Sequence, residues 1–200
     1  MPTSETGRPR PRTRNAGATR ATLVGASVSH FTEEGFARTS VDRVVAGLDL
    51  TKGAAYHHFK DKTQLFEAAF EFVQARFSEQ LGAAVSGLVD PDTILATSLD
   101  QYLTACRDPS FLRIAVLEAP AALGWERWKE MEAPHLLGVL RAALAKRSGD
   151  PGAASSAAPV VLAAASAAGL ELSTVSPARV GSERRRLVGV ILAMAQGLDR

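Results

Sequence analysis

The sequence predicts an all-helical protein, and three observations support this prediction. Apolar residues recur at spacings of three, four and seven along most of the chain, and no stretch alternates with the period of two typical of strands. Alanine is abundant and aromatic residues make up only 6% of the 200 residues, a composition that suits helix more than sheet. Glycines and Asp-Pro pairs stand where helices would end and begin.

The first segment, residues 1–17, is expected to be a disordered basic arm. It is rich in Pro, Arg, Thr and Gly and therefore has little with which to build a core. A helix is expected to follow from about residue 18 to residue 34, with Val24, Val28 and Phe31 on one face. Gly35 then stands where a left-handed C-cap would end this helix.

Two short helices are expected next. Thr39 and Ser40 offer N-cap hydroxyls for the first, and a turn at Asp49 follows it. Thr51 caps the second, which ends at the apolar anchor Phe59. Two short helices joined by a tight turn, with the second able to enter a groove, form a helix-turn-helix.

Within the run from His30 to Phe70, a specific set of residues recurs in a fixed order: Phe31, Gly35-Phe36, Thr39-Ser40-Val41, Lys52-Gly53, Tyr56-His57-His58-Phe59, Lys62 and Leu65. In this order and spacing the run resembles the N-terminal domain of TetR/AcrR-type transcriptional regulators. Asp49 departs from the family pattern, which usually has Gly there, and we expect Asp to tolerate a left-handed turn. The segment from Ala105 to Ala145 also resembles a ligand-domain subtype of this family, which implies a helical sensor domain.

We therefore expect three parts: the arm (1–17), a helix-turn-helix DNA-binding domain (18–64) and a helical ligand-binding and dimerisation domain (65–200). Residues 1–62 carry ten Lys and Arg against six Asp and Glu, whereas residues 63–200 carry thirteen against fifteen. The positive end is therefore the predicted DNA-binding end. The arm is either a solubilising tail or a segment that follows phosphates or enters a minor groove.

The DNA contacts are expected on and around the second short helix. The predicted set is Thr39, Ser40, Arg43, Thr51, Lys52, Gly53, Ala54, Tyr56, His57 and Lys62. Most of these would hold phosphates, which fix the register but carry little sequence information. Gly53 lets a phosphate approach the backbone, and Arg43 is placed to address a guanine.

The remaining helices are expected at 61–88, from Asp90-Pro91, from Asp108-Pro109, and over 121–147, 159–172 and 182–198. Pro120 is expected to interrupt the chain, Pro134 to kink it, and residues 148–158 and 177–181 to form a loop and a break. The long helix from Asp61 begins in the DNA-binding domain and ends in the larger one, so it can join the two mechanically.

The last two helices are the candidates for a dimer surface. The final helix is apolar around much of its circumference, although it could instead close the core of a single protomer. The predicted interface residues are Ala164, Ala168, Leu187, Val188, Ile191, Leu192 and Ala195. Two helices from each subunit would form a four-helix bundle.

The middle helices would surround an apolar pocket with a few polar groups. The predicted pocket residues are Tyr102, Cys106, Phe111, Trp125, Trp128 and Met131, each of which could also be plain core. Arg113, Glu118 and His135 are further candidates for the pocket. However, charged residues and isolated histidines more often lie at the surface or have a structural role. Glu126, Glu130 and Glu132 are expected to form a solvated helix face.

Enzymes and membrane proteins fit the sequence poorly. It contains no Gly-rich phosphate loop, no metal-ligand set and no nucleophile-elbow serine, so no catalytic residue, metal or cofactor is expected. No secretory signal or membrane span is expected, and the single cysteine, Cys106, fits a reducing cytoplasm.

The leading hypothesis is a homodimeric repressor that binds an inverted-repeat operator and is released by a small-molecule effector. An alternative is a DNA-binding protein that is controlled by a protein partner or acts architecturally, without a small molecule. An enzyme that has kept a DNA-binding head is a third, weaker hypothesis.

Overall fold

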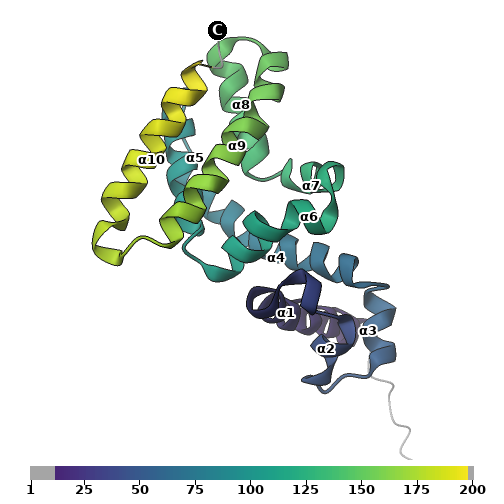
Figure 1. Ribbon diagram of the computed structural model, residues 1–200. Helices are drawn as coiled ribbons and strands as arrows, with labels where there is room; N and C mark the ends of the chain where they lie inside the picture. The colour runs from purple at the N-terminus through teal and green to yellow at the C-terminus, as the bar shows by residue number, and fades with distance from the viewer. Residues whose placement is uncertain (1–11, 198–200) are drawn as a thin grey trace, which may run out of the picture.

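The computed structural model describes residues 12–197, with side chains from residue 16 onward. Every element in that range is helical, as the sequence predicted. The elements are α1 (Arg12–Arg38), α2 (Val41–Ala46), α3 (Lys52–His58), α4 (Lys62–Val85), α5 (Pro91–Ala105), the π-helix η1 (Phe111–Glu118), α6 (Ala119–Leu123), α7 (Trp125–Glu132), α8 (Leu136–Ser148), α9 (Pro151–Ser173) and α10 (Pro177–Gly197). Figure 1 shows α1 to α3 as a small unit at one end, the later helices as a larger unit, and α4 between them.

The first helix starts earlier than expected. It begins at Arg12 and not at residue 18, and residues 1–11 of the predicted arm lie outside the described residues. The helical path breaks at Gly35, where φ is 80° and ψ is 170°. Glycine is therefore needed at Gly35, as predicted, although the ψ of 170° lies outside the left-handed helical region expected of the C-cap.

Both predicted N-caps of the helix-turn-helix are confirmed. Ser40 Oγ accepts from the Arg43 amide at 3.2 Å, and Thr51 Oγ1 accepts from the Ala54 amide at 3.2 Å. The expectation for Asp49 was wrong. No described non-glycine residue has a positive φ, so the turn between α2 and α3 does not use a left-handed residue at that position.

Helix α4 joins the two units, as the sequence predicted. Asp61 caps its start by accepting from the Gln64 amide at 2.8 Å. The Phe66 ring packs edge-on against Phe31 of α1, with ring centroids 4.9 Å apart. Further along, Phe77 packs against Phe111 of η1 at 5.1 Å. One rigid helix thus carries packing contacts to the head at its start and to the larger unit at its end.

Of the two predicted boundaries in the middle of the chain, one differs from the structure and one is confirmed. Pro120 does not interrupt the chain, because it lies in the first turn of α6, where its missing N–H costs nothing. The break falls at Gly124, whose φ is 80°. The split near Pro134 is confirmed, since α7 ends at Glu132 and α8 begins at Leu136.

The predicted loop at 148–158 was wrong, because α9 begins at Pro151. Asp150 caps that start and accepts from the amides of Gly152 and Ala153 at 2.8 and 3.0 Å. An Asp-Pro pair starts this helix as another starts α5, and the small residues that read as a loop are helical. The predicted break at 177–181 was wrong for the same reason, since α10 begins at Pro177.

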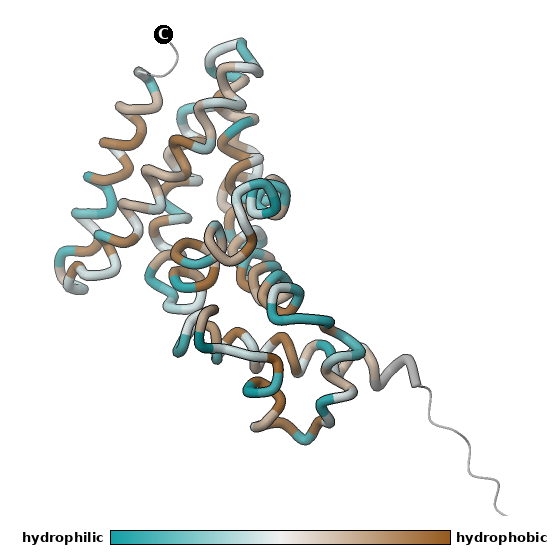
Figure 2. The backbone as a smooth tube through the Cα atoms, turned by 45° about the vertical axis from the view of Figure 1, so that its right-hand side comes forward, coloured by the Kyte–Doolittle hydropathy of each residue, from teal (hydrophilic) through white to brown (hydrophobic). Residues whose placement is uncertain are grey.

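Helix α9 lies at the centre of the larger unit and packs along α8 and α10. Figure 2 shows apolar stretches recurring along the helices of this unit, including α9 and α10. By length and composition α9 could cross a membrane, with a mean hydropathy of 1.5 over its most apolar window, contrary to the sequence expectation. In the structure 44% of that window is buried, so one side of α9 packs on its neighbours and the other side faces outward.

Candidate DNA-binding surface and regulatory cavity

The short helix α3 is anchored on one side and open on the other. Ala55 is fully buried and Phe59 is nearly so, which fixes the helix against α1 and α2. Five of the predicted contacts, Thr51, Lys52, Gly53, Tyr56 and His57, are exposed around it. A Cβ at Gly53 would meet only the Thr51 hydroxyl, at 4.0 Å, so the space in front of this backbone is empty.

An acidic residue that the sequence analysis missed organises this surface. Asp42 of α2 pairs with Lys52 Nζ at 2.6 Å and accepts from the Tyr56 hydroxyl at 3.2 Å. The hydrogen bond from Lys52 lowers the pKa of Asp42, and the same contact raises the pKa of Lys52. Asp42 thus occupies, in the free protein, the polar tips that would meet a phosphate.

Arg43 is also held by a carboxylate. Its guanidinium lies 2.9 Å from Glu34 at the end of α1 and donates to the Arg38 carbonyl at 3.2 Å. The side chain is more than half exposed, so these contacts can be exchanged for others.

Two residues of the predicted DNA set have structural roles instead. Thr39 is only 2% exposed, and its hydroxyl donates to the Gly35 carbonyl at 2.8 Å. Lys62 Nζ donates to the Phe36 carbonyl at 2.8 Å and lies 4.3 Å from the centre of the Phe36 ring. In the free protein both side chains therefore stabilise the end of α1.

Arg113 and Glu118 meet at the junction between the head and the larger unit. Their side chains form an ion pair at 2.8 Å, and the Glu118 carboxylate accepts from the Phe36 amide. A Cβ at Gly35 would collide with both side chains. Glycine at position 35 thus permits the head to seat closely on η1, and these two partly exposed residues lie at the junction and outside the cavity between α5, α6, α7 and α9.

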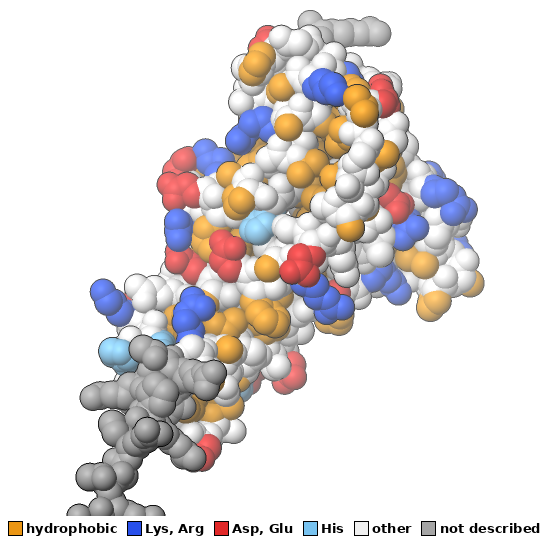
Figure 3. All heavy atoms as spheres, turned by 180° about the vertical axis from the view of Figure 1, so that it is seen from behind, with side chains coloured by type: hydrophobic (Ala, Val, Ile, Leu, Met, Phe, Trp, Pro, Cys, Tyr) orange, Lys and Arg blue, Asp and Glu red, His pale blue; other side chains and the backbone are white. Residues whose placement is uncertain are grey.

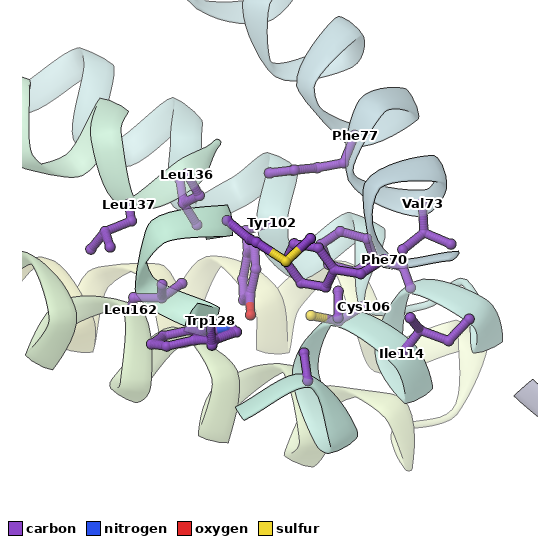
Figure 4. Close-up of a cluster of buried hydrophobic side chains, with 14 of the residues drawn as sticks. Phe70, Val73, Phe77, Tyr102, Cys106, Ile114, Trp128, Leu136, Leu137 and Leu162 are labelled. Atoms are coloured by element: carbon purple, nitrogen blue, oxygen red, sulfur yellow. The ribbon is translucent and has the colours of Figure 1, made fainter. Parts of the chain in front are cut away.

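A cavity of about 190 Å³ lies between α5, α6, α7 and α9. Its lining residues are Tyr102, Ala115, Val116, Pro120, Trp125, Trp128, Glu132, Pro159, Leu162, Ala163 and Ser166. Tyr102, Trp125 and Trp128 belong to the predicted pocket set. Figure 4 shows Tyr102 and Trp128 converging from different helices. The Tyr102 hydroxyl lies 2.9 Å from Ser166 Oγ, so it bridges α5 and α9.

The other three predicted pocket residues lie outside this cavity. Cys106 is almost fully buried, and burial raises the pKa of its thiol to about 12, so it is an inert core residue. Phe111 packs between Phe77 and Tyr102 and lines a separate hollow of about 230 Å³. Met131 faces an open groove of about 670 Å³ between α1 and α4.

Glu132 was wrongly expected to be solvated. It is only 2% exposed and lines the cavity, and the loss of hydration raises the pKa of its carboxyl to about 8, partly offset by the nearby amides of Leu137 and Leu136. One carboxyl oxygen accepts from Gln74 Nε2 of α4, and the other, Oε1, has no hydrogen-bond partner among the described residues. Its position four residues after Trp128, on the same helical face, is the sequence signal that could have identified it.

A second polar contact links the same turn to α4. His135 Nδ1 lies 2.6 Å from Ser78 Oγ, and its Nε2 lies 3.5 Å from Glu71. Burial lowers the pKa of His135, although the Glu71 carboxylate partly opposes this effect. Together with the contact from Gln74, these bonds tie the junction of α7 and α8 to the helix that leads to the head.

The predicted dimer residues mostly serve the protomer core. Ala168, Val188, Ile191 and Ala195 are buried, and Ala164, Leu187 and Leu192 are partly buried. The outward face carries a different row of residues, which we call the outer stripe: Val160, Ala163, Ala167 and Leu170 on α9, with Val190, Ala193 and Met194 on α10. The predicted residues therefore lie mainly on the inward face of these two helices, and the outer stripe lies on their outward face.

Charges of both signs mix on the surface away from α3. On the face shown in Figure 3, Lys, Arg, Asp and Glu side chains alternate without a patch of one sign.

Comparisons with known proteins agree with this architecture. Residues 23–69 match the family model described as bacterial regulatory proteins, tetR family, and residues 93–198 match a tetracyclin repressor-like C-terminal domain. The chain is 26% identical over 132 residues to the transposon Tn10 TetC protein of Escherichia coli, an alignment that spans 66% of each protein. It is 31% identical over 61 residues to the transcriptional regulator AcrR of Shigella flexneri, over 30% of this chain and 28% of AcrR.

Solved structures extend the similarity to nearly the whole chain. A TetR-family transcriptional regulator from Pectobacterium atrosepticum matches with a TM-score of 0.66 and 26% identity, over 94% of this chain and 97% of that one. RolR, solved in complex with the ligand resorcinol, shares the fold with a TM-score of 0.64 and 18% identity, over 94% and 96% of the two chains. The two family models cover both the head and the larger unit, and the chain therefore belongs to the tetR family of bacterial regulatory proteins.

Proposed function

We propose that this protein is a homodimeric transcriptional repressor that binds a specific operator and leaves it when a small-molecule effector binds. The observation that carries the proposal is the exposed face of α3, the second helix of the helix-turn-helix, on which Lys52, Gly53, Tyr56 and His57 lie. A helix presented in this way fits the major groove.

The contacts of the free protein suggest how DNA is bound. Lys52 and Tyr56 exchange Asp42 for a phosphate, which offers the same charge and more acceptor oxygens. The Thr51 cap leaves the first amides of α3 near the open space at Gly53, where a phosphate approaches the backbone. Arg43 leaves Glu34 to reach a base edge, with guanine as the best partner.

The outer stripe supports dimerisation. Val160, Val190 and Met194 are each about half exposed, although they are large and apolar, and they lie on the last two helices. A second copy related by a two-fold axis would cover them and form a four-helix bundle. Two heads would then sit about one turn of DNA apart, roughly 34–36 Å.

Effector control follows from the links to α4. The cavity touches α7 through Trp125, Trp128 and Glu132, and the Gln74 contact joins Glu132 to α4. A ligand that binds the two states of α4 unequally shifts the spacing of the heads and releases the operator. The cavity favours this mechanism over the alternative of control by a protein partner alone, for which a filled core would be expected.

The proposal is tested by incubating the protein with fragments of the source genome at near-physiological salt and sequencing those that remain bound. A few fragments that share an inverted repeat are the expected result. Unbiased fragments that wash off steeply with salt would mean phosphate-only binding, and the repressor assignment would then fail.

A further inference from the structure

We propose that the cavity between α5, α6, α7 and α9 binds a small arylalkyl amine, with Glu132 as the anion that pairs with its ammonium group. This inference rests on the proposed effector control and names the chemical class of the effector.

The charge of the cavity selects a cation. Glu132 is the single acidic or basic side chain among the lining residues that the structure describes, it is 2% exposed, and a bound cation would favour its ionised form. Its Oε1 atom has no hydrogen-bond partner among those residues. A buried carboxylate oxygen without a donor is costly, so a ligand that supplies a charged donor to Oε1 provides a contact that the protein lacks. An anionic ligand would meet Glu132 with no Lys or Arg in the lining to offset it.

The remaining walls suit an aromatic body. Trp125 and Trp128 lie with ring centroids 4.9 Å apart, and Tyr102 faces the same space from α5. Indole and phenol rings stack on another ring and also attract a cation to their faces. Lys129 lies 5.7 Å from the Trp125 ring, but it pairs with Glu126 at 2.9 Å, so its charge is balanced outside the cavity.

The volume limits the ligand to one ring and a short chain. The cavity measures about 190 Å³, below the range of roughly 300–1,000 Å³ typical of drug-sized ligands. A cavity of about 150 Å³ already accommodates benzene. A ring, two methylene groups and an ammonium group therefore match both the size and the position of the charge.

The same carboxyl group connects the ligand to α4. Gln74 Nε2 donates to one oxygen of Glu132, and the proposed ammonium would take the other. A ligand that draws the carboxylate toward Trp128 changes the contact with Gln74. The binding site and the helix that leads to the head thus share one side chain.

The protonation of Glu132 gives a second signature. Burial raises its pKa to about 8, so the empty site is mostly protonated at pH 6, and binding of an ammonium releases that proton. Other titratable groups near Glu132 are Glu71 on α4, Tyr102 on α5 and His135 in the turn before α8. Affinity for the amine should therefore rise close to tenfold per pH unit below the pKa of Glu132, and level off above it.

The test uses the two tryptophans, since the sequence contains only two and both line the cavity. Full-length protein is titrated with phenethylamine, with its neutral analogue 2-phenylethanol and with phenylacetate, while intrinsic fluorescence is recorded. We expect saturable binding of phenethylamine, at least tenfold weaker binding of 2-phenylethanol, and no binding of phenylacetate. Glu132→Gln should abolish the preference for the amine, whereas the exposed Glu126→Gln should retain it.

Equal affinity for the amine and the alcohol, no response to phenethylamine, or an unchanged preference in a folded Glu132→Gln variant would overturn the inference. Thermal melts of both variants establish that they fold. The genomic selection uses the protein without ligand, so the two proposals fail separately. A specific operator without amine binding removes this inference alone, whereas amine binding without a specific operator removes the repressor assignment.

Discussion

Two carboxylates, Asp42 and Glu132, differ in how easily their contacts can be exchanged. Asp42 is exposed and holds Lys52 and Tyr56 by contacts that water and salt weaken, so DNA can displace it. Glu132 is buried, and it keeps an oxygen without a partner because the fold encloses it. The first carboxylate is therefore easily exchanged, and the second requires a specific charged partner.

Replacement of Lys52 by Ala should weaken operator binding at moderate salt. One phosphate contact is lost, so the slope of log affinity against log salt should become shallower by about one. Fluorescence anisotropy of a labelled operator across a salt series measures both effects. Lys146→Ala removes an exposed lysine of the larger unit, which donates to the Val89 carbonyl, and should leave the slope unchanged. Equal slopes for Lys52→Ala and the wild type would contradict the phosphate role of Lys52.

The raised pKa of Glu132 should make the protein less stable as pH rises. Its carboxyl titrates near 8 in the folded state and near 4.5 when exposed, so the folded state binds about one more proton between these values. The stability gained below pH 4.5 is lost as pH rises toward 8. Glu132→Gln should remove about one proton from the pH slope of the free energy of unfolding, measured by urea denaturation at several pH values. Glu126→Gln is the control, and a slope of the wild type that matches Glu132→Gln would show that Glu132 is already ionised.

At the scale of elements, the sequence correctly predicted the helix ends that are determined by neighbouring residues. The caps at Ser40, Thr51 and Asp61 and the glycine break at Gly35 are set by residues next to them, and all were anticipated. The start of α9 was missed, because Gly152, Ser155 and Ser156 offset the helical preference of the alanines around them, and the segment becomes helical through the Asp150 cap and packing on α8.

The candidate site residues also fall into two groups: those that a local motif identifies and those that depend on tertiary packing. The exposed face of α3 follows from a short motif, so its members could be listed from sequence. Burial of Glu132, the partners of Asp42 and the junction between Arg113, Glu118 and Gly35 depend on side chains that are distant in sequence or hidden by tertiary packing. Helical spacing alone gives the orientation of a residue on its helix, but it does not say which face is covered.

The close approach of α9 to α5 should depend on Gly169. A Cβ there would collide with the Cys106 side chain. Gly169→Ala should therefore lower the free energy of unfolding by about 1–3 kcal/mol, as overpacking of a core does. Cys106→Ala in the same chain should recover part of this loss. Gly82→Ala on α4, where a Cβ meets nothing within 4 Å, should stabilise by roughly 0.5–1 kcal/mol. Additive effects of Gly169→Ala and Cys106→Ala would contradict the contact.

At the scale of the whole molecule, two units are joined by one helix, α4. The head is seated on η1 through Gly35, and α4 runs from the head to the bundle that encloses the cavity. In the proposed dimer, operator binding requires two heads at a fixed spacing, so the outer stripe, the cavity and α4 would act together. A change in any one of them should alter operator binding without touching α3.

A charge in the outer stripe should separate the protomers. Val190 is 46% exposed on α10, and Val190→Glu would bury an unpaired carboxylate in the proposed dimer. Analytical ultracentrifugation should show a monomer for this variant and a dimer for the wild type, together with at least tenfold weaker operator binding. Val89→Glu, at a site that is 72% exposed, is the matched control and should stay dimeric. A dimeric Val190→Glu would mean that the interface lies elsewhere.

The most direct test of the account is the distance between the two heads on the selected operator. Lys60→Cys places a spin label just after α3, and buried Cys106, with its pKa raised to about 12, is protected from labelling. Pulsed dipolar spectroscopy should give one narrow distance population on the operator, consistent with recognition helices roughly 34–36 Å apart. Saturating phenethylamine should broaden or shift this population as the complex dissociates. The absence of any dipolar coupling on the operator would contradict a paired-head repressor.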